Sequence, residues 1–440
     1  MSFENLGLSQ PVLQALALKE YTASTPIQEQ AIPILLKGKD LLGIAQTGTG
    51  KTAAFMLPSI DRLIASGKRP QRGTCRMLVL APTRELASQI AESARAYGRF
   101  SHISVATVFG GTSINKNRQD LSRGVDVLVA TPGRLLDLVE QRWLDLRQVE
   151  ILVLDEADQM LDLGFIHDLK KIVRFLPEKR QSLFFSATMP KAIRDLADRF
   201  LTSPEQVAVT PVSSTVERVE QYVTFVNQPE KPALLTMMLR VGFGPKGSMD
   251  RVLIFSRTKH GADRIVKQLA QTGIPANAIH GNKSQPQRER ALAEFKDGKV
   301  KILIATDIAA RGIDVSGVSH VINFDLPNVS EQYVHRIGRT ARAGAAGVAV
   351  AYCAEDERPY LKGIERLTKQ TLTPVPLPEG FNAEAARIKA ARAKSPIQIV
   401  ERPEREERPS RGRPSRRYSA RPARPQGERS GGGRRRHASR

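Results

Sequence analysis

A glycine-rich loop constrains the fold of this chain more than any other segment. The apolar run Asp40–Ile44 leads into Ala45–Thr52, which reads Ala-Gln-Thr-Gly-Thr-Gly-Lys-Thr, and helix-forming residues follow. Such a loop binds phosphate through its backbone amides when it joins a strand to the N-terminus of a helix. The strict pattern has glycine where Ala45 stands. The sequence therefore predicts an α/β fold with a phosphate site at the end of a strand.

Within this loop the residue types predict separate roles. Lys51 should reach the outer phosphates, and the hydroxyl of Thr52 should bind Mg²⁺. The remaining loop residues should hold the phosphates through their backbone, and they are Ala45, Gln46, Thr47, Gly48, Thr49 and Gly50.

Carboxylates stand at the end of a second predicted strand, Ile151–Leu154. Asp155, Glu156 and Asp158 follow it directly. Such acids often belong only to a solvated turn, but acids that follow a phosphate loop in chain order indicate a magnesium-nucleotide site.

We expect different tasks for these three acids. Asp155 should bind the metal, directly or through water, and Glu156 should orient or deprotonate the attacking water. Asp158 should tie the site to Ser186 and Thr188 at the end of the next predicted strand.

Length and composition exclude several classes of protein. A chain of 440 residues with 41% apolar and 25% charged residues predicts two to three globular domains. Cys75 and Cys353 have no metal-binding or redox spacing, which favours ordinary thiols in a reducing cytosol. No apolar run has the length of a membrane span, and the first residues lack a signal-peptide pattern. We therefore expect a soluble cytoplasmic protein with no membrane association.

The charge is strongly positive and unevenly distributed. Of the formal net charge of +22, Glu401–Arg440 contributes 14 Arg against 5 Glu. Basic chains favour polyanionic partners because phosphate neutralisation releases counterions. A charge run is often only a solvated tail, but nucleic acid is the favoured partner here.

Two regions alternate short apolar runs with helical stretches, which predicts parallel sheets with crossover helices. The strands expected in the first region are Asp40–Ile44, Met77–Leu80, Val105–Val108, Val127–Ala130, Ile151–Leu154 and Ser182–Phe185. Those expected in the second region are Arg251–Phe255, Lys301–Ala305, His320–Phe324 and Gly347–Tyr352.

The two regions also share a spacing. The same number of residues separates Thr83 from Thr131 as separates Thr258 from Thr306, and each threonine follows a predicted strand. Coincidence is possible with so few positions, but a duplicated α/β unit explains the spacing better.

With these motifs in place, the chain resembles the DEAD-box ATP-dependent RNA helicases. Asp155-Glu156-Ala157-Asp158 is similar to the family signature, and the other family motifs follow in order between residues 3 and 375. Residues Tyr21–Gln28 resemble the adenine-recognition segment, with Phe3 as its upstream aromatic residue. The resemblance implies that Gln28 reads the adenine edge and that Tyr21 stacks on the ring. Glu20, Ser24 and Ala341 depart from the family pattern.

The resemblance also implies RNA contacts. In the first lobe the implied residues are small, hydroxyl-bearing or cationic, and they are Pro82, Thr83, Arg84, Gly110, Gly111, Thr131, Pro132, Gly133 and Arg134. In the second lobe Arg257 and Thr306 are implied RNA contacts, and Asp314 is implied to bind the ribose of the nucleotide.

The segment His335–Arg342 resembles the arginine-finger motif of the family. His335, Arg339 and Arg342 are therefore implied catalytic residues, and the two arginines would meet the γ-phosphate only after the lobes close. Such fingers raise rates about 10³–10⁵-fold in related phosphoryl-transfer enzymes.

The implied fold is two tandem RecA-like lobes with a disordered basic tail. We expect an adenine-recognition segment over 1–30, an ATP-binding lobe over 31–206, a linker over 207–218 and a second lobe over 219–375. Residues 376–440 are rich in Arg, Pro, Ser and Gly and should be disordered.

The implied activity is an RNA-stimulated ATPase that clamps RNA, separates short duplexes and uses ATP and Mg²⁺. RNA would be read largely without sequence preference, and the implied partners are ribosome-assembly or RNA-degradation machinery. The compact core and short basic tail most resemble the bacterial RhlE subgroup. Two alternatives stay open at this point: a non-catalytic RNA-binding module switched by ATP, and a DNA translocase.

Overall fold

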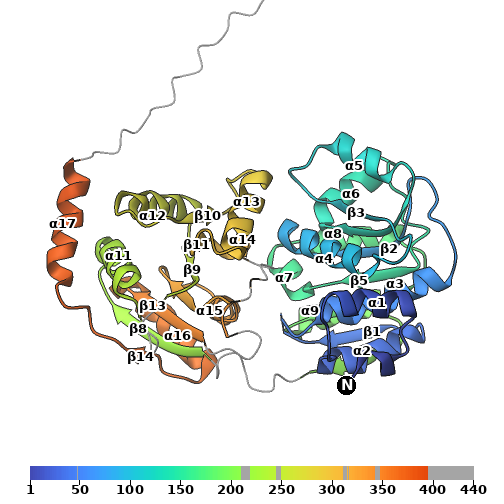
Figure 1. Cartoon of the computed structure of the whole chain (residues 1–440), viewed down its shortest axis with the longest axis horizontal. Coiled ribbons are helices and arrows are strands. Elements are labelled where there is room, and N and C mark those ends of the chain that lie inside the picture. The colour runs from blue at the N-terminus through green and yellow to red at the C-terminus, as the bar shows by residue number, and fades with distance from the viewer. Residues whose placement is uncertain are drawn as a thin grey trace, which may run out of the picture. The chain divides into compact units, whose positions relative to one another are not determined.

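Two sheets of parallel strands organise the chain (Figure 1). A computed structural model describes residues 1–46, 48–209, 219–243, 249–310, 315, 317–341 and 347–394, with only the backbone described for 391–394. Thr47, Asp314 and Arg342, most of the predicted linker and residues 395–440 lie outside the described residues.

The first sheet has the strand order β3-β4-β2-β5-β6-β1-β7, and all its pairings are parallel. Its strands are β1 Leu41–Ile44, β2 Cys75–Leu80, β3 Val105–Val108, β4 Val125–Ala130, β5 Ile151–Leu154, β6 Gln181–Ser186 and β7 Glu205–Ala208. The six strands predicted for this region are present. β7 was not predicted, since it is an edge strand in which only Val207 is buried. The predicted linker therefore starts too early at residue 207.

Helices cover both faces of this sheet because the central strands are apolar on both sides. The helical elements are η1 Phe3–Leu6, α1 Gln10–Leu18, α2 Pro26–Leu36, α3 Lys51–Ala65, α4 Arg84–Tyr97, α5 Ile114–Leu121, α6 Pro132–Glu140, α7 Ala157–Asp162, α8 Ile166–Ile172, η2 Val173–Phe175 and α9 Lys191–Phe200. Met77 and Val79 pack with α1 to α4, whereas Leu78 and Leu80 pack with α6 to α9. Alternate strand residues thus serve two separate cores, as expected for a parallel sheet.

The second sheet has the order β10-β11-β9-β12-β13-β8-β14. Its strands are β8 Val219–Phe225, β9 Val252–Phe255, β10 Asn277–Ile279, β11 Ile302–Ala305, β12 His320–Asn323, β13 Gly347–Cys353 and β14 Thr373–Pro374. Each strand takes the place of its counterpart in the first sheet, so that β8 stands where β1 stands and β12 where β5 stands. The described sheets therefore support the predicted duplication.

The helical elements of the second lobe are η3 Gln228–Glu230, α11 Lys231–Val241, α12 Lys259–Gln271, α13 Gln285–Lys296, α14 Asp307–Ala310, α15 Ser330–Ile337, η4 Glu355–Glu357, α16 Arg358–Thr368 and α17 Phe381–Lys394. Among the described residues, no helix combines the length and apolar character that a membrane span requires.

The helix α17 corrects the predicted start of the disordered tail at residue 376. Phe381 is buried in the core that includes α11, and Ala385 and Ile388 pack against the same core. The Arg240 guanidinium lies 3.7 Å from the carboxylate of Glu384. The three apolar residues recur at helical spacing, so a single amphipathic face orders this segment despite its polar composition.

Candidate active site

The predicted nucleotide residues meet at one edge of the first sheet. β5, β6 and β1 are neighbours, and parallel strands end at the same edge. The glycine-rich loop follows β1, the three acids follow β5, and Ser186 ends β6. The structure therefore brings together residues that are more than a hundred positions apart in the sequence.

Two glycines shape the phosphate loop. Gly48 and Gly50 have φ of 88° and 94°, a region that favours glycine. A Cβ atom on Gly50 would lie 2.5 Å from Nε2 of Gln28. The Thr49 hydroxyl donates a hydrogen bond of 2.8 Å to the Gln46 carbonyl, and Lys51 begins α3. The loop thus ends at the N-terminus of a 15-residue helix, where unpaired amides favour an anion.

Gln28 ties the predicted adenine segment to this loop. Its Oε1 accepts from the Thr25 amide at 2.9 Å, and its Nε2 donates to the Gly50 carbonyl at 3.2 Å. A carboxamide has two acceptor sites and two donor hydrogens. One of each stays available, so the predicted reading of adenine is compatible with these bonds.

A cavity of about 510 Å³ adjoins the loop, and Tyr21, Gln28 and Lys51 line it. The sequence interpretation missed part of the lining, which includes Gln89, Ser93 and Tyr97 on α4. These three residues recur every fourth position and so share one helix face, a signal that was present in the sequence. Phe3 packs instead in the buried core of the lobe.

The rings of Tyr21 and Tyr97 meet edge to face, with centroids 6.4 Å apart. Tyr21 is 41% exposed, whereas Tyr97 is 3% exposed. Burial raises the pKa of the Tyr97 phenol, and the neighbouring Tyr21 raises it further. Tyr97 therefore stays neutral and lines the cavity with a largely buried side chain.

The three acids are buried, and Lys51 lies beside the first of them. Asp155 is 2% exposed, and the Lys51 Nζ lies 3.9 Å from its Oδ1. Burial raises the pKa of Asp155 to about 6; Lys51 opposes this shift, and Glu156 and Asp158 add to it. Asp155, a buried carboxylate beside a phosphate loop, fits a divalent cation, although no group of three acids among the described residues could hold one alone.

Asp158 holds the end of β6, as predicted. Its Oδ2 accepts from the amides of Ala187 and Thr188 at 3.1 and 3.0 Å, and from the Thr188 hydroxyl at 3.2 Å. The Ser186 hydroxyl donates to the Thr188 carbonyl at 2.7 Å. These bonds satisfy one oxygen of Asp158 and fix the loop after β6 beside the acids.

Glu156 adopts a left-handed backbone with φ of 53° and ψ of 52° at the start of α7. This conformation costs a residue with a side chain roughly 1–2 kcal/mol. The strained turn directs the chain from β5 into α7 immediately after Asp155. Such strain is typical of functional sites.

The predicted RNA residues of the first lobe lie at the other half of the same sheet edge. They follow β3, β4 and β2, which are neighbours in the sheet. Thr83 and Thr131 are the residues before α4 and α6, and the Thr83 hydroxyl accepts from the Leu86 amide at 3.3 Å. The two helices thus begin after neighbouring strands, and a helix N-terminus suits a phosphate group. Pro82 lies just before α4, and Pro132 and Gly133 are the first two residues of α6.

Arg84 lies against the glycine pair after β3. A Cβ atom on Gly111 would lie 2.3 Å from Arg84 Nη1, and one on Gly110 would lie 3.0 Å from Nη2. Arg134 donates to the Thr112 carbonyl at 3.1 Å. Burial chiefly lowers the pKa of Arg84, and nearby arginines including Arg134 contribute. Such crowding of cations favours an anionic ligand.

In the second lobe three residues of the arginine motif, His335, Arg336 and Arg339, meet around one small cavity. Arg336 is buried and bonds Asp307 at 2.6 and 2.8 Å and Asn323 at 3.0 Å, which fixes α15 to β12. His335 and Arg339 line a small cavity with Asp307. The sequence interpretation did not single out Arg336, because its bonds to Asp307 and Asn323 join residues that are separate in the sequence.

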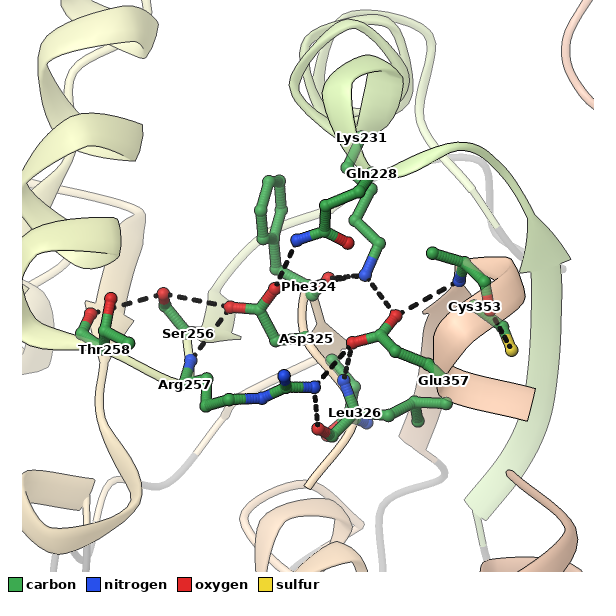
Figure 2. Close-up of polar contacts among 12 residues, drawn as sticks. Gln228, Lys231, Ser256, Arg257, Thr258, Phe324, Asp325, Leu326, Cys353 and Glu357 are labelled. Atoms are coloured by element: carbon green, nitrogen blue, oxygen red, sulfur yellow. Dashed lines mark hydrogen bonds and ion pairs between the residues drawn. The ribbon is translucent and has the colours of Figure 1, made fainter. Parts of the chain in front are cut away.

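Thr306 and Arg257 follow the neighbouring strands β11 and β9. The Thr306 carbonyl accepts from the Ala309 and Ala310 amides at 3.0 and 2.9 Å and so starts α14. Arg257 joins a polar network with Asp325 and Glu357, shown in Figure 2.

Similarity to known proteins agrees with this geometry. The sequence model of the DEAD/DEAH box helicase family matches residues 25–196, and that of the helicase conserved C-terminal domain matches 230–344. The ATP-dependent RNA helicase CshA of Listeria monocytogenes is 41% identical over 399 residues, which cover 91% of this chain and 75% of CshA. The chain belongs to the DEAD-box ATP-dependent RNA helicases. CshA of Streptococcus pneumoniae is 43% identical, over 87% of this chain and 72% of that protein.

Solved structures extend the comparison to the fold of this DEAD-box helicase. S. cerevisiae Dbp5 bound to RNA and ADP BeF3 has a TM-score of 0.75 and 31% identity, and the match covers 88% of this chain and 99% of Dbp5. Mss116p bound to ssRNA and AMP-PNP has a TM-score of 0.76 and 27% identity, with 88% and 80% covered. The prediction of two RecA-like lobes is confirmed.

Proposed function

We propose that this chain uses ATP hydrolysis to clamp RNA between its two lobes and to separate short duplexes locally. The observation that carries the proposal is the division of one sheet edge. The phosphate loop and acids occupy the half at β5, β6 and β1, and the paired helix N-termini with Arg84 and Arg134 occupy the half at β3, β4 and β2. The relatives named ATP-dependent RNA helicases support it.

In the nucleotide half, Lys51 and the amides of residues 45–50 hold the phosphates, and Tyr21 and Gln28 hold the adenine. Thr52 and Asp155 would bind Mg²⁺, which neutralises charge on the phosphates when it is bound. Glu156 orients the attacking water and accepts its proton. Asp158, Ser186 and Thr188 keep these groups in place through the bonds described above.

In the RNA half, backbone amides, hydroxyls and arginines meet phosphate and sugar groups rather than bases. Such contacts position a strand and carry no sequence information. RNA binding is therefore largely independent of sequence, and 2′-hydroxyl contacts distinguish RNA from DNA.

The second lobe completes the catalyst. Arg339, Arg342 and His335 act on the γ-phosphate, Asp314 binds the ribose, and Thr306 and Arg257 bind RNA. Because these groups belong to a separate lobe, hydrolysis requires closure, and loss of phosphate then releases the RNA.

Steady-state ATPase assays with no nucleic acid, with RNA and with DNA of matched sequence test this proposal, together with unwinding of a short RNA duplex. We expect RNA to stimulate hydrolysis and DNA to have little effect. A protein that binds ATP and RNA without turnover would instead be a switched binding module, and equal stimulation by DNA would favour a translocase.

Gly111→Ala is expected to raise the KM for RNA about tenfold, the factor for one lost charge-assisted contact, and to leave ATP affinity unchanged. The added Cβ would displace Arg84, since it would lie 2.3 Å from Nη1. Gly164→Ala is the matched control, because Gly164 has φ of 81° and open space around the Cβ position. Equal effects of the two substitutions would show that backbone strain, and not Arg84, is responsible. RNA-dependent ATPase titrations measure both.

Removal of residues 401–440 is expected to weaken RNA binding and flatten its salt dependence while core ATPase chemistry persists. The logarithmic salt slope should fall by roughly 0.7 for each lost contact with single-stranded RNA. Fluorescence titrations at several salt concentrations measure the slope, and an unchanged slope would indicate a tail that docks on protein.

The cytoplasmic setting and the partners in ribosome assembly or RNA degradation stay proposals that follow from the family. Membership of the RhlE subgroup stays a prediction that rests on the compact core and the short basic tail. The relatives reported above are named CshA and do not test it.

A further inference from the structure

The second lobe has a lysine and an aspartate in the places that Lys51 and Asp155 take in the first. Lys231 begins the helix after β8 as Lys51 begins the helix after β1, and β8 and β1 hold equivalent positions in their sheets. The Asp325 amide bonds the last carbonyl of β9, as the Asp155 amide bonds the last carbonyl of β2. The Nζ to Oδ1 distance is 3.9 Å in both pairs.

In the second lobe the carboxylate of Glu357 lies beside this pair of lysine and aspartate. The carboxylate of Glu357 accepts from Lys231 Nζ, from Arg257 Nη2 at 2.9 Å, and from the amides of Leu326 and Ala354 at 3.2 and 3.1 Å (Figure 2). Lys231 and Glu357 are 0% and 1% exposed. Where the first lobe leaves room for a phosphate beside its lysine, the second lobe therefore holds an anion of its own.

The same carboxylate restrains Arg257. Its Nη2 also donates to the Leu326 carbonyl at 3.1 Å, and its amide donates to Asp325 at 2.9 Å. The guanidinium lies 5.6 Å from the Tyr360 ring centroid. The side chain is still 38% exposed, and a guanidinium has five N–H donors. Arg257 is thus fixed in place with donors left for a ligand.

We propose that Glu357 is a positioning residue that acts as an internal substitute for phosphate and holds Arg257 ready to bind the RNA backbone. This inference rests on the proposed RNA contact of Arg257. A guanidinium fixed beforehand loses less conformational entropy when it binds a phosphate.

Glu357→Gln is expected to raise the KM for RNA about tenfold, the factor for one weakened charge-assisted contact, while kcat at saturating RNA stays near the parental value. The near-isosteric amide keeps the volume of the side chain and removes its charge. Glu355→Gln is the matched control, since Glu355 lies in the same short helix, is 81% exposed and pairs only with Arg358 among the described residues. An unchanged KM in Glu357→Gln would overturn the proposal.

Lys231→Met separates positioning from general stabilisation of the lobe. This substitution breaks the same buried pair and should lower the melting temperature, but it leaves the bonds between Glu357 and Arg257 intact. We expect a KM for RNA near the parental value. A rise equal to that of Glu357→Gln would show that the network only stabilises the lobe.

A double-mutant cycle with Arg257→Ala connects the two residues. If Glu357 acts through Arg257, Glu357→Gln has no further effect on the KM for RNA once Arg257 is removed. Independent effects would overturn the proposal, as would a parental KM in Arg257→Ala. Neither result would affect the proposed helicase activity, which is tested separately by the stimulation of the parental ATPase by RNA and DNA.

Discussion

Glu156→Gln is expected to slow ATP hydrolysis about 10²–10⁴-fold, the usual contribution of a general base, while ATP and RNA still bind. The glutamine side chain has nearly the same shape but cannot accept a proton from water. Because Glu156 is buried beside Asp155 in a strained turn, the amide should keep the same position. Steady-state ATPase rates and nucleotide titrations measure the two effects separately.

Glu140→Gln provides the control for this substitution. Glu140 is exposed at the end of α6 and makes a 3.9 Å ion pair with Lys171 on the surface. Such a pair contributes little, so its loss should not change the rate. Parental turnover in Glu156→Gln would exclude the assigned role.

Lys51→Ala is expected to weaken ATP binding by about 2–5 kcal/mol, roughly 30- to 4,000-fold. It removes the cationic partner of the buried charge pair that Lys51 would form with the phosphates of ATP. The ammonium group of Lys51 is buried at the start of α3 and has Asp155 as its ion-pair partner among the described residues. Without it, the carboxylates would repel the incoming phosphates. Isothermal titration with a non-hydrolysable ATP analogue measures the affinity.

Lys191→Ala serves as the control for charge, because it removes the same side chain from the exposed start of α9. It should leave nucleotide affinity unchanged. Equal losses in both variants, or parental affinity in Lys51→Ala, would rule out the phosphate-loop assignment.

Local signals predicted much of this site from the sequence. The phosphate loop needs a strand, glycines and a helix in immediate succession, and all three are adjacent in the chain. The opposite wall at Tyr97 depends on which face of α4 turns toward the loop, which tertiary packing decides. β7 is an edge strand in which only Val207 is buried, so its amino-acid composition resembles that of a linker.

In the second lobe, too, the sequence predicted the architecture but not the buried side-chain contacts. The threonine spacing indicated a duplicated unit, and the two strand orders agree with it. No motif marked Lys231 and Glu357, because a lysine neutralised by an internal carboxylate needs no glycine-rich loop around it. Only the folded structure brings these residues together, across more than a hundred positions.

The buried pair of Lys231 and Glu357 also bears on the number of nucleotides that one chain binds. A duplicated unit is a dimer within one chain, and two equal halves would take up two nucleotides in each cycle. Because Glu357 already neutralises Lys231, the second half holds an internal anion where the first half has its phosphate loop. The two halves therefore share one architecture but differ in chemistry, and we expect one nucleotide to bind per chain.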